Sequence, residues 1–83
     1  MRYAVVIEKA KRNYSAYVPD LPGCVATGAN EEEVERNIHE AIRFHLDGLS
    51  EDGLRAPRPA TTCGYVFAVW SPKRTSKRVR QRA

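Results

Sequence analysis

The first 27 residues contain three short runs rich in β-branched and other apolar side chains, separated by polar or proline-rich segments, and these runs predict β-strands. The first run, residues 3–8 (YAVVIE), is separated by a short polar stretch from the second run, residues 14–18 (YSAYV), so the two should form a hairpin. A third, short strand is expected over residues 24–27 (CVAT). Three odd-numbered side chains of the first run would share one face of the sheet, namely Tyr3, Val5 and Ile7.

A proline-rich segment, residues 19–23 (PDLPG), separates the second and third predicted strands. Its two prolines lack an N–H donor and fix φ, whereas Gly23 permits backbone angles that other residues avoid. We therefore expect a stiff bend rather than continuous strand pairing in this segment.

The pattern changes from a period of two to a helical period after Gly28. Asn30 is a good N-cap and Glu33 stands three residues later, where its side chain can complete a capping box. Apolar side chains then fall within an arc of about 140° on one helical face, namely Val34, Ile38, Ala41, Ile42, Leu46 and Leu49. The helix should end near Leu49, with Gly53 as the residue just beyond its cap.

A last apolar run, residues 63–70 (CGYVFAVW), is strand-like in composition and apolar on both faces. The predicted order is β-β-β-α-β, with the last strand parallel to the first, as a right-handed crossover requires. We therefore predict an α+β fold, a two-layer sandwich of one helix on one sheet.

The length of 83 residues allows a single small domain, expected over residues 1–70. The 14 Lys and Arg side chains exceed the 10 Asp and Glu side chains, which gives a net charge of +4. Six of the basic residues and no acidic one lie in residues 71–83, so residues 1–70 carry −2. The last 13 residues hold too little apolar surface to fold and should form a disordered basic tail.

Cysteine spacing and hydropathy exclude several classes of protein. Cys24 and Cys63 form no C-x-x-C pair and have no histidine at zinc-ligand spacing, so we expect two free thiols and no metal or other cofactor. No apolar run approaches the ~18 residues that would span a membrane. The apolar run near the start of the chain is too short for the hydrophobic region of a secretory signal. The chain is expected to be soluble and cytoplasmic.

Residues 18–24 (VPDLPGC) resemble a motif of the HicB-like antitoxin family. The similarity continues through Gly28, the acidic residues at the helix start, Asn37, residues 49–53 (LSEDG) and the prolines beyond them. It extends from Tyr3 to about Trp70, with these features in the family's order and spacing.

The resemblance implies a partial RNase H-like fold and a protein that neutralises a small HicA-type mRNA-cleaving toxin. The family often carries a C-terminal helix-turn-helix or ribbon-helix-helix domain that binds the operon's promoter. Residues 71–83 occupy its place here, so the resemblance leaves open whether this chain regulates its own operon. A small core of this size also favours a homo-oligomer, a dimer or tetramer.

An RNase H-like outline raises the question of nuclease activity, which needs acidic side chains on the first strand, the helix and the last strand to hold two metal ions. Glu8 and Glu40 can supply the first two, but residues 63–70 contain no acid. We therefore expect no catalytic residue and no enzyme activity. His45 falls within the apolar arc of the helix and is interpreted as a partly buried histidine.

Two side chains are candidates for contact with a partner protein. Phe44 projects away from the apolar arc of the helix, and an exposed aromatic suits a contact with a toxin or a second subunit. Asp20 lies in the proline-rich bend, where it would face a basic partner. Toxins that bind RNA are generally basic, and a body of charge −2 suits such a partner.

The basic tail supports an alternative function, that of a stand-alone regulator that contacts DNA or RNA. Its basic side chains would neutralise phosphates in a weak, salt-dependent and sequence-independent manner. The candidate nucleic-acid contacts are Lys73, Arg74, Lys77, Arg78, Arg80 and Arg82.

Overall fold

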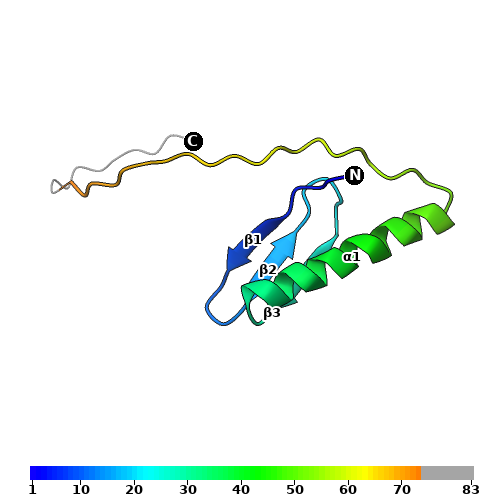
Figure 1. Cartoon of the computed structure of the whole chain (residues 1–83), viewed down its shortest axis with the longest axis horizontal. Helices are drawn as coiled ribbons and strands as arrows, with labels where there is room; N and C mark the ends of the chain where they lie inside the picture. The colour runs from blue at the N-terminus through cyan, green and yellow to red at the C-terminus, as the bar shows by residue number, and fades with distance from the viewer. Residues whose placement is uncertain (74–83) are drawn as a thin grey trace.

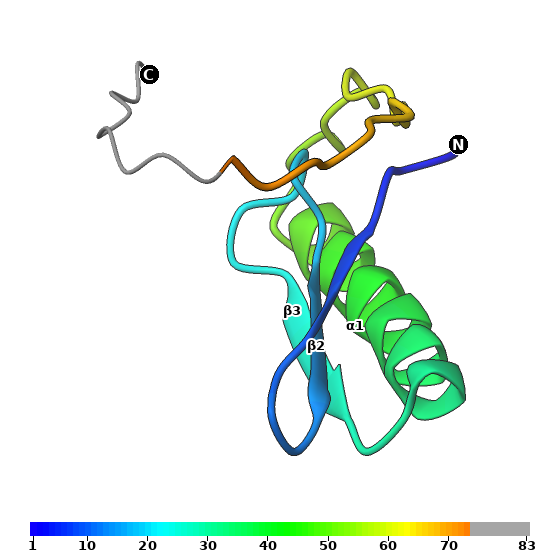
Figure 2. The same ribbon diagram turned by 90° about the vertical axis from the view of Figure 1, so that its left-hand side faces the viewer.

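The computed structural model describes residues 1–73, which form a small antiparallel sheet with one long helix across it (Figure 1). The strands are β1 (Val6–Lys9), β2 (Tyr14–Tyr17) and β3 (Val25–Gly28), in the order β1-β2-β3. The helix α1 (Glu31–Glu51) lies on one face of the sheet, over β2 and β3 (Figure 2). The α+β class and the β-β-β-α order are therefore confirmed for this part of the chain.

The strand register determines which side chains the helix covers. Ile7, Ala16 and Ala26 stand opposite one another across the three strands and pack into the core. Their neighbours Val6 and Tyr17 point to the opposite face, because side chains alternate along a strand. Tyr3, Val5 and Ile7, which were predicted to share one face, all pack against the core.

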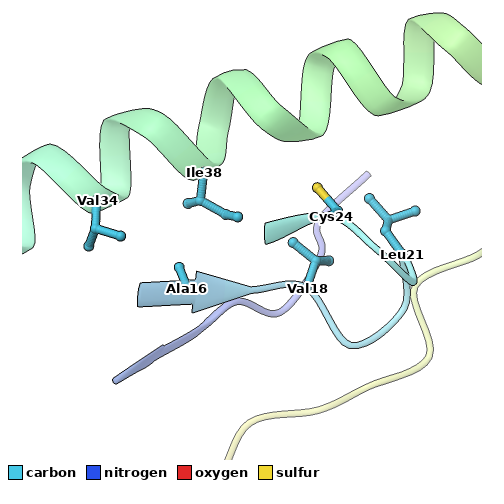
Figure 3. Packing of buried hydrophobic residues seen from close by; sticks show 6 residues of the cluster. All are labelled: Ala16, Val18, Leu21, Cys24, Val34 and Ile38. Carbon is cyan, nitrogen blue, oxygen red and sulfur yellow. The ribbon is translucent and has the colours of Figure 1, made fainter. Parts of the chain in front are cut away.

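The core is small and lies between α1, β2 and the proline-rich bend (Figure 3). Val34 and Ile38 point from the helix toward the sheet, and the bend contributes Leu21, which is 0% exposed. The remaining buried side chains are Ala16, Val18 and Cys24. Each large aliphatic side chain buried here contributes about 1.5–3 kcal/mol of transfer free energy, so this core gives a modest stability.

The helix begins at the predicted cap. The Asn30 side chain accepts a hydrogen bond from the backbone N–H of Glu33 at 2.8 Å. The Glu33 carboxylate accepts in return from the backbone N–H of Ala29 at 2.9 Å, one residue before the cap. Three glutamates in the first turn also place negative charge at the positive end of the helix dipole.

The helix ends two residues later than predicted, at Glu51, and closes in a Schellman motif. The Gly53 N–H donates to the Ser50 carbonyl at 3.0 Å, and the Leu54 N–H donates to the Leu49 carbonyl at 2.9 Å. Gly53 has φ +73°, a left-handed conformation that glycine adopts without steric cost. The predicted role of Gly53 as the residue after the cap is confirmed.

The helix start approaches β3 so closely that no side chain fits at Gly28. A Cβ at this position would lie 2.5 Å from the Val34 backbone nitrogen. The Asn37 amide donates to the Thr27 carbonyl at 2.8 Å and joins the next turn of the helix to the same strand. The angle between helix and sheet is thus determined by two adjacent contacts.

The prediction of a fourth strand is wrong for the described chain. Residues 63–70, which we call the apolar arm, contain no strand and lead away from the sheet in an extended conformation (Figure 1). The physical reason is that strand-like composition favours an extended backbone, whereas a strand also needs hydrogen bonds to a neighbouring strand. The arm is exposed along its whole length, with Phe67 92% exposed.

Candidate partner-binding surfaces

The proline-rich bend is a compact pair of turns that connects β2 with β3. The Leu21 N–H donates to the Val18 carbonyl and the Cys24 N–H donates to the Leu21 carbonyl, each at 3.0 Å. Gly23 has φ +85°, which allows the second turn to close. The bend therefore buries Leu21 and presents the Asp20 side chain at the surface.

The Asp20 carboxylate contacts a segment 40 residues further along the chain. Its Oδ2 atom accepts hydrogen bonds from the backbone N–H groups of Ala60 at 2.9 Å and Thr61 at 3.0 Å. Its Oδ1 atom accepts from the Thr61 hydroxyl at 2.9 Å. These bonds, first those from the two backbone N–H groups, lower the pKa of Asp20 because they favour its charged form.

A second bond fixes the same segment closer to the helix. The Tyr3 hydroxyl donates to the Pro57 carbonyl at 2.6 Å. Residues 61–63 then lie beside residues 2–5, just before β1 begins. The base of the apolar arm is therefore anchored on the N-terminal end of the domain by Tyr3 and Asp20.

The exposed aromatic of the helix borders a groove, which we call the Phe44 groove. Phe44 is 81% exposed, as its position on the helical wheel predicted. The groove has a volume of about 430 Å³ and lies between the bend and the C-terminal half of α1. Its apolar lining comes from the start of β3, from the residue before it and from α1, and includes Cys24, Val25, Ala41, Phe44 and Leu49.

Charged side chains surround the Phe44 groove. Asp52 lines the groove itself, while Glu40, Arg43 and Asp47 form an adjoining depression on the other side of Phe44. Three carboxylates and one guanidinium give this rim a net negative charge. An apolar centre with an acidic rim is complementary to a basic partner that inserts an apolar side chain.

A second groove lies along β1, and we call it the β1 groove. It has a volume of about 420 Å³ and lies between the β1 edge of the sheet and the adjacent side of α1, which covers β2 and β3. Glu35 and His39 stand beside it, and its apolar lining consists of Val5, Ile7, Ile38 and Ile42. Within residues 1–73, β1 pairs with β2 alone, so one edge of β1 is free.

The other residues singled out in the sequence fall into three groups. His45 is half-buried, as predicted, and lines the Phe44 groove, whereas Glu8 is exposed on β1. Of the candidate nucleic-acid contacts, only Lys73 belongs to the described residues; Arg74, Lys77, Arg78, Arg80 and Arg82 lie outside them. Asp20 is hydrogen-bonded to Thr61, and Phe44 is exposed on the surface of α1. Contact of either side chain with a partner remains a prediction.

The described part of the chain contains no group of three or more His, Cys, Asp and Glu side chains arranged to hold a metal ion. None of its helices combines the length and the apolar character needed to cross a membrane. The candidate surfaces of this small α+β domain are the two grooves and the exposed arm.

Comparison with known proteins assigns the domain to a family. Residues 3–68 match the model of the HicB-like antitoxin of bacterial toxin-antitoxin systems. A chain of the solved HicA3 and HicB3 toxin-antitoxin complex superimposes with a TM-score of 0.63 at 28% identity, covering 72% of this chain and 70% of that chain. The protein belongs to the HicB-like antitoxin family.

Several curated proteins are similar to the chain. A 14.9 kDa protein of Haemophilus phage HP1 is 41% identical over 66 residues, which are 80% of this chain and 50% of the phage protein. A UPF0150 protein of Helicobacter pylori is 51% identical over 49 residues, covering 59% of this chain and 68% of that protein. A UPF0150 protein of Thermoplasma acidophilum is 39% identical over 59 residues, covering 70% and 86%. The chain thus spans about half the length of the phage protein.

Proposed function

We propose that this protein is an antitoxin that binds a small, basic HicA-type mRNA-cleaving toxin and neutralises it by occlusion. The observation that carries the proposal is the similarity, in both sequence and fold, to a chain of the HicA3 and HicB3 toxin-antitoxin complex. The match of residues 3–68 to the antitoxin family supports the same role. Membership of an antitoxin family also suggests a non-enzymatic role.

The Phe44 groove is the surface that we assign to the toxin. Binding energy concentrates in aromatic side chains at the centre of an interface, and Phe44 is an exposed aromatic beside an apolar groove. The acidic rim suits a toxin whose RNA-binding surface is basic, because phosphate contacts require Lys and Arg. A typical stable interface covers about 800 Å² on each partner, so the groove would be the centre of a larger contact.

The test is co-expression with the product of the adjacent reading frame, which the proposal expects to be a small basic protein. Co-purification of the two chains, together with relief of the growth arrest that the neighbour causes alone, is the expected result. A matched experiment uses Phe44→Asp, which places a carboxylate at the apolar border of the groove. If Phe44→Asp protects cells as well as the wild type does, the groove is not the toxin contact. If neither the wild type nor Phe44→Asp protects cells or binds the toxin, the antitoxin role itself fails.

The partial RNase H-like arrangement, the homo-oligomeric state and the location in the cytoplasm are part of the same proposal. A domain with so small a core gains stability when copies associate. A dimer or tetramer would also present several Phe44 grooves to toxin molecules. Contact of the basic tail with DNA or RNA remains a prediction, and loss of promoter binding in a variant that ends at Ser71 would support it.

A further inference from the structure

The β1 groove and the apolar arm are complementary surfaces that are both left open within one chain. The free edge of β1 exposes backbone N–H and C=O groups that a further strand can pair with. Beside that edge, the β1 groove offers apolar side chains, among them Ile7 and Ile42. A strand added to β1 would insert every second side chain into this groove.

The apolar arm has the composition of such a strand. It carries no charged side chain, and its two faces are both apolar: Tyr65, Phe67 and Val69 on one, Val66, Ala68 and Trp70 on the other. Five of these six side chains are large, and each of the five is at least 80% exposed. Such an exposed apolar run is unusual in a monomer and indicates an interaction site.

The anchors hold the base of the arm at the N-terminal end of the sheet, and the arm leaves the domain from there. Asp20 holds residues 60 and 61, and Tyr3 holds Pro57, so the chain passes the N-terminal end of the sheet before the arm begins. Beyond these anchors the arm extends outward instead of turning along β1 (Figure 1). The radius of gyration is accordingly 17.7 Å, against about 11–12 Å for a compact domain of this size.

We propose that the apolar arm of each chain forms a fourth strand on the β1 edge of a second copy, which gives a strand-exchanged dimer. Each arm fills the β1 groove of the other chain, so the α+β sheet is completed between subunits. Exchange of an identical element is a low-cost route to a dimer, because the same contacts serve both chains.

The surface available is close to that of a small stable interface. Aromatic side chains bury about 150–250 Å² each, and Tyr65 and Phe67 lie on the same face of the arm, so these two rings on two arms remove up to about 600–1,000 Å² from water. The surfaces of the two grooves that the arms cover add to this area. Stable interfaces bury about 1,200–2,000 Å² in total, and the rings together with the covered groove surfaces approach the lower end of this range.

The proposal deepens the self-association put forward above, but it is independent of toxin binding, and its test contains no toxin. One variant, Val66→Asp/Phe67→Asp, places a carboxylate on each face of the arm; the other, Ile42→Glu, places one in the β1 groove. Each variant alone should have the mass of a single 9.4 kDa chain, while the wild type has twice that mass. Leu54→Asp, an exposed apolar position outside arm and groove, is the matched control and should remain a dimer.

The decisive step is to mix the two variants. In a heterodimer, the intact arm of the groove variant meets the intact groove of the arm variant, so one of the two sites is restored. Native mass spectrometry should then detect the heterodimer. A monomeric wild type, variants that remain dimeric, or a mixture that yields only monomers would overturn the proposal.

A second measurement does not depend on the folding of any variant. A wild-type sample is prepared from two differently isotope-labelled pools, unfolded together and refolded. Nuclear Overhauser effects between the arm's aromatic rings and the Ile42 methyl groups should appear between chains of different label. If they appear only within one chain, the arm occupies its own groove and the exchange is excluded.

Discussion

The Asp20 carboxylate holds Thr61 by two hydrogen bonds across 41 residues of sequence, from the backbone N–H at 3.0 Å and from the hydroxyl at 2.9 Å. Asp20 belongs to the proline-rich bend, and Thr61 stands just before the apolar arm. Asp20 therefore has a structural role within the chain, because its hydrogen bonds determine where the apolar arm begins.

This contact should respond to acid. The hydrogen bonds from Ala60 and Thr61 place the pKa of Asp20 below its ordinary value, which is about 3.9. Their contribution to stability is therefore complete above about pH 4 and is lost as the pH falls through the lower pKa of the folded chain. Amide shifts of Ala60 and Thr61, followed by NMR from pH 7 to pH 2, should report an inflection below about 3.9.

The control for this titration is Asp20→Asn, which removes the titrating group while it keeps the size of the side chain. The shared inflection of the two amides should disappear in this variant. An inflection at or above the ordinary carboxyl value in the wild type would contradict the anchoring role of Asp20.

Gly28 should be intolerant of any side chain. A Cβ there would lie 2.5 Å from the Val34 nitrogen and 2.8 Å from its Cα, and both atoms belong to the backbone of the first helical turn. Gly28→Ala should therefore lower the free energy of unfolding by about 1–3 kcal/mol, as overpacking does. Denaturant unfolding followed by circular dichroism measures the change.

Gly48→Ala is the matched control for this substitution. Gly48 lies within α1, and a Cβ at that position meets no atom within 4 Å. Alanine in a helix interior is about 0.5–1 kcal/mol more favourable than glycine, so this variant should be more stable than the wild type. Equal effects of the two substitutions would show that the close approach at Gly28 has no energetic consequence.

Local features of the fold were predictable from the sequence because neighbouring residues determine them. The bend at residues 19–23, the Asn30 cap and the left-handed Gly53 each depend on side chains within a few positions. The fourth strand was predicted wrongly for the opposite reason. The composition of residues 63–70 indicates an extended backbone but does not say which edge, or which chain, supplies the pairing.

The candidate surfaces were only partly predictable for a related reason. The helical wheel placed Phe44 outside the apolar arc, and it is exposed. No short sequence pattern predicts the β1 groove. The groove forms because α1 packs over β2 and β3 and leaves β1 uncovered. The Asp20–Thr61 contact likewise joins segments that no short pattern connects.

Cys24 should resist thiol reagents until the domain unfolds. Its side chain is 4% exposed, and burial raises the pKa of the thiol because the thiolate would lose its hydration. In a Cys63→Ser background, reaction with a chromogenic disulfide should be slow in buffer and fast in denaturant. Rapid reaction of the folded chain would show that the core around Cys24 opens readily.

The same raised pKa gives a pH dependence in the alkaline range. A thiol whose pKa is higher in the folded chain contributes its full stability below the ordinary value, which is about 8.5. This contribution is lost as the pH rises toward the higher pKa of the folded state. Unfolding midpoints of the Cys63→Ser chain should therefore fall above about pH 8.5, and this fall should be absent when Cys24 is also replaced by alanine.

Phe44→Ala should separate binding from folding. The ring is 81% exposed, so its removal should change the free energy of unfolding by no more than about 0.5 kcal/mol. If the ring is the centre of the toxin contact, the dissociation constant should rise about tenfold or more, as for an aromatic hot spot. Calorimetric titration with the toxin measures this effect, and Leu54→Ala, a substitution at another exposed apolar position, should leave the dissociation constant unchanged.

The mass of the dimer should be unaffected by Phe44→Ala, because Phe44 is not part of the β1 groove. A variant that binds toxin normally but dissociates into monomers would move Phe44 from the toxin contact to the contact between subunits.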